Sequence, residues 1–255
     1  MRSVSRAFVR PVSPSLVSCG LTFIARQPID IARAEIQHAD YCDVLRQAGV
    51  VLDVLPPAPD LPDAVFVEDA AVVLDDLIVI TRPGTDTRRQ ETVSAAALLA
   101  DAAPLSFIRE PGTLDGGDVL RIGRDLFVGT GGRSNRDGID QLAAIASRFG
   151  YRVTAVPVRG CLHLKTAVTA LDDNTVLLLT AHVDRAVFAA FDAVEADAGE
   201  PAGANVLALN ERIIAAVSAP RTRDAIGQRG YDVDTLDMSE FEKAEAGLTC
   251  LSILI

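Results

Sequence analysis

The sequence of 255 residues lacks a long apolar run, a secretory signal and a basic face. A membrane-spanning helix needs about 18 or more consecutive apolar residues, and no run approaches that length. A signal peptide needs an apolar segment behind its basic start, and none follows the N-terminal arginines. The arginine- and serine-rich start resembles a transit peptide in composition. However, "RAFVRPV" at residues 6–12 also predicts a strand, so we expect a folded start.

The charge balance is acidic, because 24 lysines and arginines face 35 aspartates and glutamates, giving a net charge of −11. Nucleic-acid binding would need a basic face, so we predict no nucleic-acid partner and no membrane. Nearly half of the residues are apolar, which excludes a disordered chain. Lys165 and Lys243 are the only lysines, and we attribute this to genome composition.

Cysteine is scarce and widely spaced, at Cys19, Cys42, Cys161 and Cys250. Without a close pair, a zinc site or a disulfide framework is not expected, and reduced thiols in a cytoplasm are predicted. We expect three of the four to be packing residues. The segment "GLTCLSILI" leaves two interpretations of Cys250. It is either a small apolar residue of a terminal strand or a nucleophile that the chain surrounds.

Four stretches of the chain share one pattern. Each has an opening polar residue, two β-rich runs around a tight polar turn, and an alanine-rich stretch with helical spacing. In three of them another strand-like run follows. The openings at Asp69, Asp115, His163 and Asn205, followed by Cys250 in an incomplete fifth unit, recur every 42 to 48 residues. A period of this size indicates stacked or radial repeats.

The incomplete fifth unit has only the strand "TCLSILI". The N-terminal part offers the missing elements: a strand at 6–12, a helix at 29–49 and a strand at 50–56. Joining the two ends completes the unit and removes an unpaired sheet edge. We therefore predict an α/β fold, a five-bladed β/α propeller of five ββαβ units closed by the N- and C-terminal strands. The alternative is an ordinary α/β sheet with similar elements.

A ring of this kind would bring the unit openings together near its axis: Glu68, Asp69, Asp115, His163 and Cys250. Cysteine, histidine and a carboxylate are the parts of a thiol nucleophile system. The thiolate attacks an electrophilic carbon, and the imidazole passes a proton to the leaving group. A carboxylate holds the imidazole or the substrate in place.

Three histidines compete for this role. His38 lies in a helical stretch, and we expect a surface or packing residue. His182, in "LTAHVDRA", is expected at a helix start. His163 stands at the opening of its unit and is therefore the preferred candidate.

Charged residues near the expected ring centre suggest a ligand. We expect "PDAVFVED" to place Asp63, Glu68 and Asp69 around one strand, with Asp63 and Asp69 on the same face. They are either solvated surface acids or a site for a guanidinium or amine. Arg88 and Arg133 follow the second strands of successive units and could hold a carboxylate in bidentate fashion. Together with a thiol, these groups fit a small zwitterion such as an arginine derivative.

The stretches "LPDAVFVEDAAVV", "TLDGGDVL", "LHLK" and "GLTC" resemble the dimethylarginine dimethylaminohydrolase family of the pentein group, whose fold is a five-bladed β/α propeller. The resemblance runs in order along the whole chain and implies one catalytic pentein domain over residues 1–255. The implied reaction hydrolyses Nω-methylated L-arginine, asymmetric dimethylarginine or monomethylarginine, to L-citrulline and dimethylamine or methylamine. It proceeds through a covalent thiouronium intermediate and uses no metal or organic cofactor.

The resemblance also implies roles for individual residues. Cys250 matches the nucleophile, His163 the general acid/base, and Asp115 the carboxylate that completes the triad. Three acids match the family residues that surround the guanidine and amino groups of the substrate. Two arginines match the residues that bind its carboxylate, and two further residues match positions that hold its amino end. These implied substrate-binding residues are Leu21, Asp63, Glu68, Asp69, Arg88, Arg133 and Ala244. Alanine stands at position 244 where the family often has a larger aliphatic residue.

Two other functions are consistent with the same sequence. One is an arginine deiminase or another guanidine-modifying hydrolase, although those deiminases usually carry an extra helical insertion that does not fit within 255 residues. The other is a catalytically silent amino-acid-binding protein that keeps the pocket. A papain-like protease is disfavoured, because its cysteine precedes its histidine and here the order is reversed. We expect a small-molecule substrate and either a monomer or a homodimer.

Overall fold

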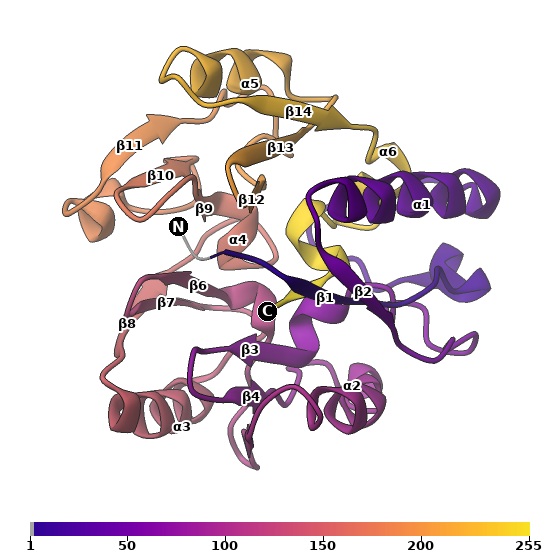
Figure 1. Ribbon diagram of the computed structural model, residues 1–255, viewed down its shortest axis with the longest axis vertical. Coiled ribbons are helices and arrows are strands. Elements are labelled where there is room, and N and C mark those ends of the chain that lie inside the picture. Colours follow the sequence, from indigo (N-terminus) through magenta and orange to yellow (C-terminus); the bar gives the residue numbers. More distant parts are fainter. Residues whose placement is uncertain (1–2) are drawn as a thin grey trace.

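Five small sheets of three strands surround a common axis in the computed structural model, which describes residues 3–255 (Figure 1). Within each sheet the middle strand pairs antiparallel with one neighbour and parallel with the other. The parallel pair needs a crossover connection, which the helices of the repeat supply. The predicted five-bladed β/α propeller is therefore confirmed.

Four of the sheets consist of strands that are consecutive in the sequence. They are β3 (Ala71–Val73), β4 (Ile78–Ile80) and β5 (Leu105–Phe107); β6 (Val119–Ile122), β7 (Asp125–Thr130) and β8 (Arg152–Pro157); β9 (Val168–Ala170), β10 (Thr175–Leu178) and β11 (Asp192–Glu195); and β12 (Leu207–Leu209), β13 (Arg212–Ala216) and β14 (Val233–Leu236). The first two strands of each sheet form the hairpin that the polar turns predicted.

The fifth sheet joins the two ends of the chain. Its order is β15 (Ile253–Leu254), β1 (Arg6–Val9) and β2 (Val51–Val54), and Phe8 lies opposite Ile253 in the antiparallel pair. Helix α1 (Ile31–Gln47) connects β1 to β2. The closing strand therefore completes a unit whose other elements come from the start of the chain, as the repeat predicted, and the inner edge of β1 is paired.

Helices cover the outside of the ring (Figure 1). The crossover helices are α1, α2 (Glu91–Leu99), α3 (Arg136–Ala146) and α5 (Pro220–Gly227), and the short helices are α4 (Leu164–Ala167) and α6 (Ser239–Glu242). Leu45, Leu99, Leu142 and Ile226 of the crossover helices are fully buried. Each long helix thus turns an apolar stripe toward the sheets.

The third unit departs from the predicted pattern, because its alanine-rich stretch forms only a short 3-10 helix, Arg185–Phe188. The connection from Leu178 to Asp192 is the shortest of the five crossovers, which leaves no room for a long helix. Instead, Phe188 is buried against Phe127, with the ring centroids 4.9 Å apart. Aromatic packing therefore covers this sheet where a helix covers the others.

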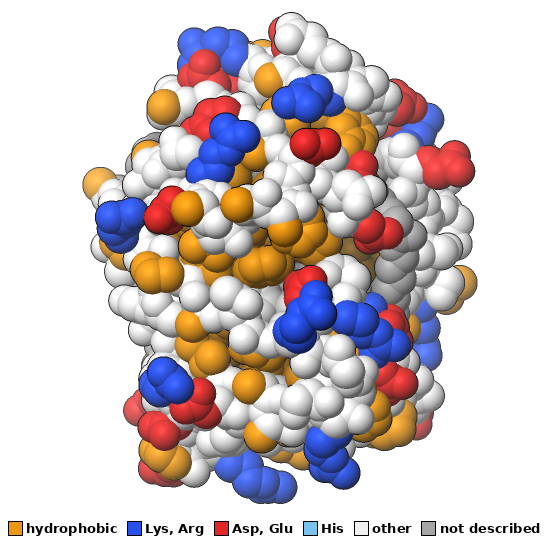
Figure 2. Space-filling model, turned by 90° about the vertical axis from the view of Figure 1, so that its left-hand side faces the viewer, with side chains coloured by type: hydrophobic (Ala, Val, Ile, Leu, Met, Phe, Trp, Pro, Cys, Tyr) orange, Lys and Arg blue, Asp and Glu red, His pale blue; other side chains and the backbone are white. Residues whose placement is uncertain are grey.

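Figure 2 shows the side of the ring where β8 and β11 lie, and acidic and basic side chains are interspersed on it. One pair on this side is Arg152 and Asp125, whose Nε and Oδ1 are 2.8 Å apart. The negative net charge is therefore not gathered into one patch on the face drawn. Within residues 3–255, no helix combines the length and the apolar character that crossing a bilayer requires.

Candidate active site

A cavity of about 380 Å³ is lined by loops from several units of the ring. Cys250 reaches it from a 3-10 helix at Leu248–Leu251, and His163 from the N-cap position directly before α4. Asp69 reaches it from a 3-10 helix at Val67–Ala70. Residues far apart in the sequence are therefore neighbours around one small space.

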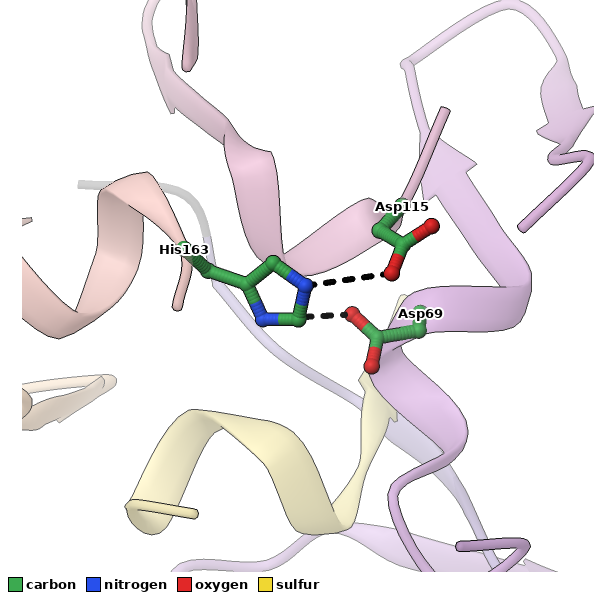
Figure 3. A group of neighbouring side chains, drawn as sticks. All are labelled: Asp69, Asp115 and His163. Carbon is green, nitrogen blue, oxygen red and sulfur yellow. Dashed lines mark hydrogen bonds and ion pairs between the residues drawn. The ribbon is translucent and has the colours of Figure 1, made fainter. Parts of the chain in front are cut away.

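His163 is buried between two carboxylates, as Figure 3 shows. Its Nε2 lies 3.1 Å from Oδ2 of Asp115, and its Nδ1 lies 3.9 Å from Oδ1 of Asp69. Burial by itself would favour the neutral ring, but Asp69 and the hydrogen bond to Asp115 outweigh it and raise the pKa of His163 to about 9. The imidazole is therefore held as a cation near neutral pH.

Asp115 is held rigidly by its own partners. Its side chain is fully buried, and its Oδ1 accepts a hydrogen bond of 2.8 Å from the backbone N–H of Gly84. Its backbone N–H donates to the hydroxyl of Ser134 at 3.2 Å, and that hydroxyl donates to Asp118 at 2.7 Å. Because both carboxylate oxygens of Asp115 are engaged, the carboxylate can fix the orientation of the imidazole.

Two glycines after Asp115 allow this close approach. A Cβ on Gly117 would lie 2.6 Å from Nδ1 of His163, and a Cβ on Gly116 would lie 2.0 Å from the carbonyl oxygen of Glu68. The backbone N–H of Gly117 also donates to Asp69 at 2.8 Å. The glycine pair of "DGGD" is therefore needed because any side chain would occupy the space of the neighbouring groups.

Cys250 lies in a tight turn at the cavity wall. Its Sγ accepts a hydrogen bond of 3.4 Å from the backbone N–H of Gly247. Burial, followed by the charges of Glu68 and Asp69, raises the pKa of the thiol to about 12. These groups therefore favour the protonated sulfur, and a positive charge beside it would favour the thiolate.

Arg88 and its acidic partners form the second charged group of the cavity wall. The guanidinium is buried, contacts Asp69 and lies 2.7 Å from Glu91, and it also donates to the carbonyl oxygen of Phe66 at 3.0 Å. Burial opposes ionisation of Asp69, yet His163 and Arg88 lower its pKa below the usual range. Most donors of Arg88 are thus already engaged, and its bidentate role toward a carboxylate stays a prediction.

The expected strand through Asp63, Glu68 and Asp69 is wrong. Residues 62–65 form a turn, and the 3-10 helix at Val67–Ala70 follows it. Carbonyl groups in this segment are paired with side chains instead of a neighbouring strand: Arg88 donates to the carbonyl oxygen of Asp63 at 3.1 Å. The apolar "AVFV" run predicted a strand because its local pattern contains no trace of this distant arginine.

This helical geometry sends two adjacent acids to different places. Asp69 lines the cavity of Cys250, whereas Glu68 lines a second cavity of about 530 Å³. There Glu68 pairs with the ammonium of Lys165 and accepts a hydrogen bond of 2.8 Å from the hydroxyl of Thr249. Glu68 therefore contacts Thr249, the residue before Cys250, from the side of the second cavity. Its role toward substrate stays a prediction.

Three of the four remaining predicted substrate residues line the first cavity. Asp63, Arg133 and Ala244 line it, and Asp63 accepts the backbone N–H of Gly20 at 3.1 Å. Arg133 contacts the hydroxyl of Thr85. Leu21 is half-buried and packs against the core cluster that includes Ala244, away from the lining of the cavity.

The other two histidines lie outside the cavity lining. His38 is buried in α1, with its Nδ1 3.8 Å from Sγ of Cys42, which confirms a packing role. The expected helix start at His182 is wrong: the residue lies in a turn, and its Nδ1 is 2.7 Å from the carbonyl oxygen of Arg159. Asp184 caps the following 3-10 helix instead. All four cysteines are free thiols, and Cys19 and Cys42 are buried.

Sequence reasoning missed two acids at the site. Glu91 pairs with Arg88 three residues earlier, a spacing that could have indicated the contact. Glu245 lines the cavity and accepts hydrogen bonds from backbone N–H groups of Thr22, Phe23 and Ile24, with a distance of 2.6 Å to Thr22. These backbone donors leave no signal in a local sequence pattern.

Asp69, Asp115 and His163 also bring potential metal-ligating atoms within 4.8 Å of one another. However, Asp115 already binds His163 and Gly84, and Asp69 already binds Arg88 and Gly117. The carboxylates are thus used to hold the imidazole and a guanidinium. A thiol and an imidazole that line one cavity, with a carboxylate bound to the imidazole, are the parts that thiol-based covalent catalysis needs.

The comparisons with known proteins agree with this geometry. A family model described as arginine deiminase matches residues 54–201, more than half of the chain. The chain is 42% identical to N(G),N(G)-dimethylarginine dimethylaminohydrolase of Streptomyces coelicolor over 251 residues, which cover 97% of this chain and 96% of the relative.

Two solved structures extend the likeness to the fold. A variant of dimethylarginine dimethylaminohydrolase from Pseudomonas aeruginosa, with cysteine changed to serine and citrulline bound, superposes with a TM-score of 0.93 at 32% identity over 100% of both chains. A dimethylarginine dimethylaminohydrolase variant with histidine changed to glycine, as an adduct with S-methyl-L-thiocitrulline, gives a TM-score of 0.94 at 33% identity. It covers 99% of this chain and 100% of the other.

The fold and the matched family model define a guanidine-modifying protein of the pentein group. Within that group, the identity to the Streptomyces protein over nearly the full length of both is decisive. The chain belongs to the dimethylarginine dimethylaminohydrolase family.

Proposed function

We propose that this protein hydrolyses Nω-methylated L-arginine, asymmetric dimethylarginine or monomethylarginine, to L-citrulline and dimethylamine or methylamine. The observation that carries the proposal is the cavity shared by Cys250 and His163, in which Asp115 holds the imidazole at 3.1 Å. Family membership adds the substrate class, because the relatives carry the name of that activity. The shared cavity supports a covalent reaction in which the guanidinium carbon is transferred from nitrogen to sulfur and then to oxygen.

The first half of the reaction forms a carbon–sulfur bond. The cationic guanidinium enters beside the buried thiol, which favours loss of the thiol proton to solvent. The sulfur of Cys250 attacks the guanidinium carbon and the bond to the methylated nitrogen breaks. His163, protonated because its pKa is about 9, gives its proton to the departing amine. A thiouronium bound to Cys250 remains.

The second half returns the enzyme to its starting state. The neutral imidazole takes a proton from a water molecule, whose oxygen attacks the thiouronium carbon. The carbon–sulfur bond then breaks, the hydroxyl proton of the intermediate passes to the sulfur, and citrulline leaves with the thiol of Cys250 restored. Asp115 stabilises the imidazolium each time it forms and keeps the ring oriented. These steps need only side chains of this chain and water.

The substrate-binding part of the proposal is assigned by charge. Asp63, Glu68 and Asp69 attract the guanidinium and the amino group, and Arg88 and Arg133 hold the carboxylate. Leu21 and Ala244 bind the amino end. Arg133 is the better placed of the two arginines for a bidentate contact, because Arg88 is already occupied by Asp69 and Glu91.

The broader organisation belongs to the same proposal. Residues 1–255 form one catalytic domain, of which residues 1 and 2 lie outside the described part. The protein acts in the cytoplasm as a monomer or a homodimer. The ring supports the single domain, because its fifth sheet needs strands from both ends of the chain.

The test is product analysis with purified protein. Asymmetric dimethylarginine should yield citrulline and dimethylamine together, measured by mass spectrometry, while arginine serves as the control. Citrulline and ammonia from arginine, with no reaction of the methylated substrate, would replace the proposal by arginine deiminase activity. That second candidate has one observation in its favour, the match to the family model described as arginine deiminase.

A further inference from the structure

Asn205 opens the fourth unit of the ring, at the position that Asp115 and His163 occupy in the second and third units. The mechanism above leaves it without a role, and it does not line the cavity that holds Cys250. It is nonetheless buried, only 5% exposed, two residues before the first strand of its unit. A buried amide is costly unless its hydrogen bonds are made.

The amide of Asn205 is fully used between two segments of the proposed active site. Its Oδ1 accepts the backbone N–H of Thr249 at 3.1 Å, and its Nδ2 donates to the hydroxyl of the same threonine at 3.1 Å. The Nδ2 group also donates to the carbonyl oxygen of Lys165 at 2.9 Å. Thr249 directly precedes Cys250, and Lys165 lies two residues after His163. One side chain therefore links the nucleophile's segment to the imidazole's segment.

Packing and a second link support the same connection. A Cβ on Gly247 would lie 2.5 Å from Cγ of Asn205, so only glycine lets the turn approach the amide this closely. That turn holds the sulfur, since Gly247 donates to Sγ of Cys250. The hydroxyl of Thr249 donates a hydrogen bond to Glu68 at 2.8 Å, and Glu68 pairs with Lys165. The hydrogen bonds of Asn205 and the contacts from Thr249 through Glu68 to Lys165 thus connect the same two segments.

We propose that Asn205 is a positioning residue that fixes the turn carrying Cys250 relative to the segment carrying His163. It acts through Thr249 and Lys165 and does not touch substrate. This inference rests on the proposed thiol chemistry. The attacking sulfur and the proton-donating nitrogen must both face one carbon, and a displacement of about 1 Å can cost on the order of 100-fold in rate.

The test compares the same substitution at two asparagines. Asn205→Asp keeps the shape of the side chain but replaces both N–H donors by a carboxylate oxygen. The matched control is Asn210→Asp, because Asn210 also bridges two segments: it accepts from the N–H of Val4 at 2.8 Å and donates to the carbonyl oxygen of Ala48 at 3.2 Å. Neither Asn210 nor its partners line the cavity of Cys250.

Two readouts are measured on each variant: kcat and KM with asymmetric dimethylarginine, and the pH profile of Cys250 alkylation by iodoacetamide. The folded fraction is checked by circular dichroism. For Asn205→Asp we expect kcat to fall about 10- to 100-fold with KM changed much less, and the alkylation profile to shift to higher pH. Asn210→Asp should leave both readouts at the wild-type values. Thr249→Ser should retain activity, and Thr249→Val should lose it, because only serine keeps the hydroxyl.

Equal behaviour of the two Asp variants in kcat and alkylation, at equal folded fraction, would overturn the positioning role. So would a loss of kcat in Asn205→Asp that matches a loss of folded protein. If the wild-type protein does not turn over the methylated substrate, the proposed function fails. The alkylation profiles then still decide whether Asn205 positions the thiol.

Discussion

The two cavities that meet at the 3-10 helix Val67–Ala70 differ in chemistry more than in size. The larger one, about 530 Å³, contains Glu68 and Lys165, which neutralise each other. The smaller one, about 380 Å³, contains a thiol and an imidazole that is held as a cation. The comparison shows that volume alone does not identify the active site. A nucleophile and a proton carrier facing the same space do.

The strongest test of this comparison is to remove the nucleophile from the smaller cavity. Cys250→Ser should lower kcat for asymmetric dimethylarginine on the order of 10⁵-fold or more, because loss of a nucleophile removes the covalent route. The folded structure should be retained, as judged by circular dichroism. Cys161→Ser is the control, since Cys161 is outside the lining of that cavity and should keep wild-type kcat. Full activity in Cys250→Ser would contradict the assignment.

Removing the cation from the larger cavity should mainly affect stability. Lys165→Met leaves Glu68 as a buried charge without its partner, and such a loss costs about 3–5 kcal/mol in free energy of unfolding. Lys243→Met is the matched control: Lys243 is 27% exposed, and its buried partner Glu240, 2.7 Å away, also accepts the backbone N–H of Asp30 at 2.9 Å. We expect it to cost about 1 kcal/mol or less. Urea unfolding of both variants measures the difference. Equal losses would mean that the larger cavity does not depend on its ion pair.

The pH dependence of the free energy of unfolding should reveal the contribution of His163, the imidazole of the smaller cavity. The pKa of His163 is raised from its ordinary 6.5 to about 9, so the folded state favours the protonated ring. The stability that it contributes is fully present below pH 6.5 and is lost as the pH rises through 9. As the pH rises between these values, the free energy of unfolding of His163→Gln should therefore decrease less than that of the wild type. Urea unfolding at pH 6.5 and 9.5 measures this decrease for both proteins. An equal decrease in the two would contradict the prediction.

The smallest expected effect concerns the thiol itself. Its pKa of about 12 reflects burial and the nearby carboxylates Glu68 and Asp69. A bound cationic, unreactive guanidine should lower that pKa, and iodoacetamide should then alkylate Cys250 several-fold faster at pH 7. The rate is followed by mass spectrometry of the modified peptide, and a neutral ligand of similar size controls for occlusion. If the neutral ligand does not slow alkylation, the thiol is not occluded. An unchanged rate with the cation would then refute this electrostatic effect.

Periodicity made most of the fold predictable. The five openings that recur along the chain correspond to five sheets, and the pairing of β15 with β1 follows from the incomplete fifth unit. The absence of a long helix in the third unit was not predictable, because composition does not reveal that its crossover is too short. The turn at His182 was not predicted either, since local propensity favoured a helix start there.

The site was predictable in its members more than in its arrangement. The sequence singled out Cys250 and His163, and the cavity brings them together. It wrongly placed Asp63 and Asp69 on one face of a strand, where the chain forms a turn and a 3-10 helix. Contacts from distant parts of the chain, above all the buried guanidinium of Arg88, decide the backbone path there.

The sequence by itself determined the repeat, the closure of the ring and the set of reactive groups, because these depend on residue types at regular intervals. Only the tertiary structure decided that the adjacent acids Glu68 and Asp69 enter different cavities and that Asn205 joins the segments of Cys250 and His163. The physical reason is that side-chain direction and hydrogen-bond partners are set by backbone atoms and charges from other units. No local pattern contains them.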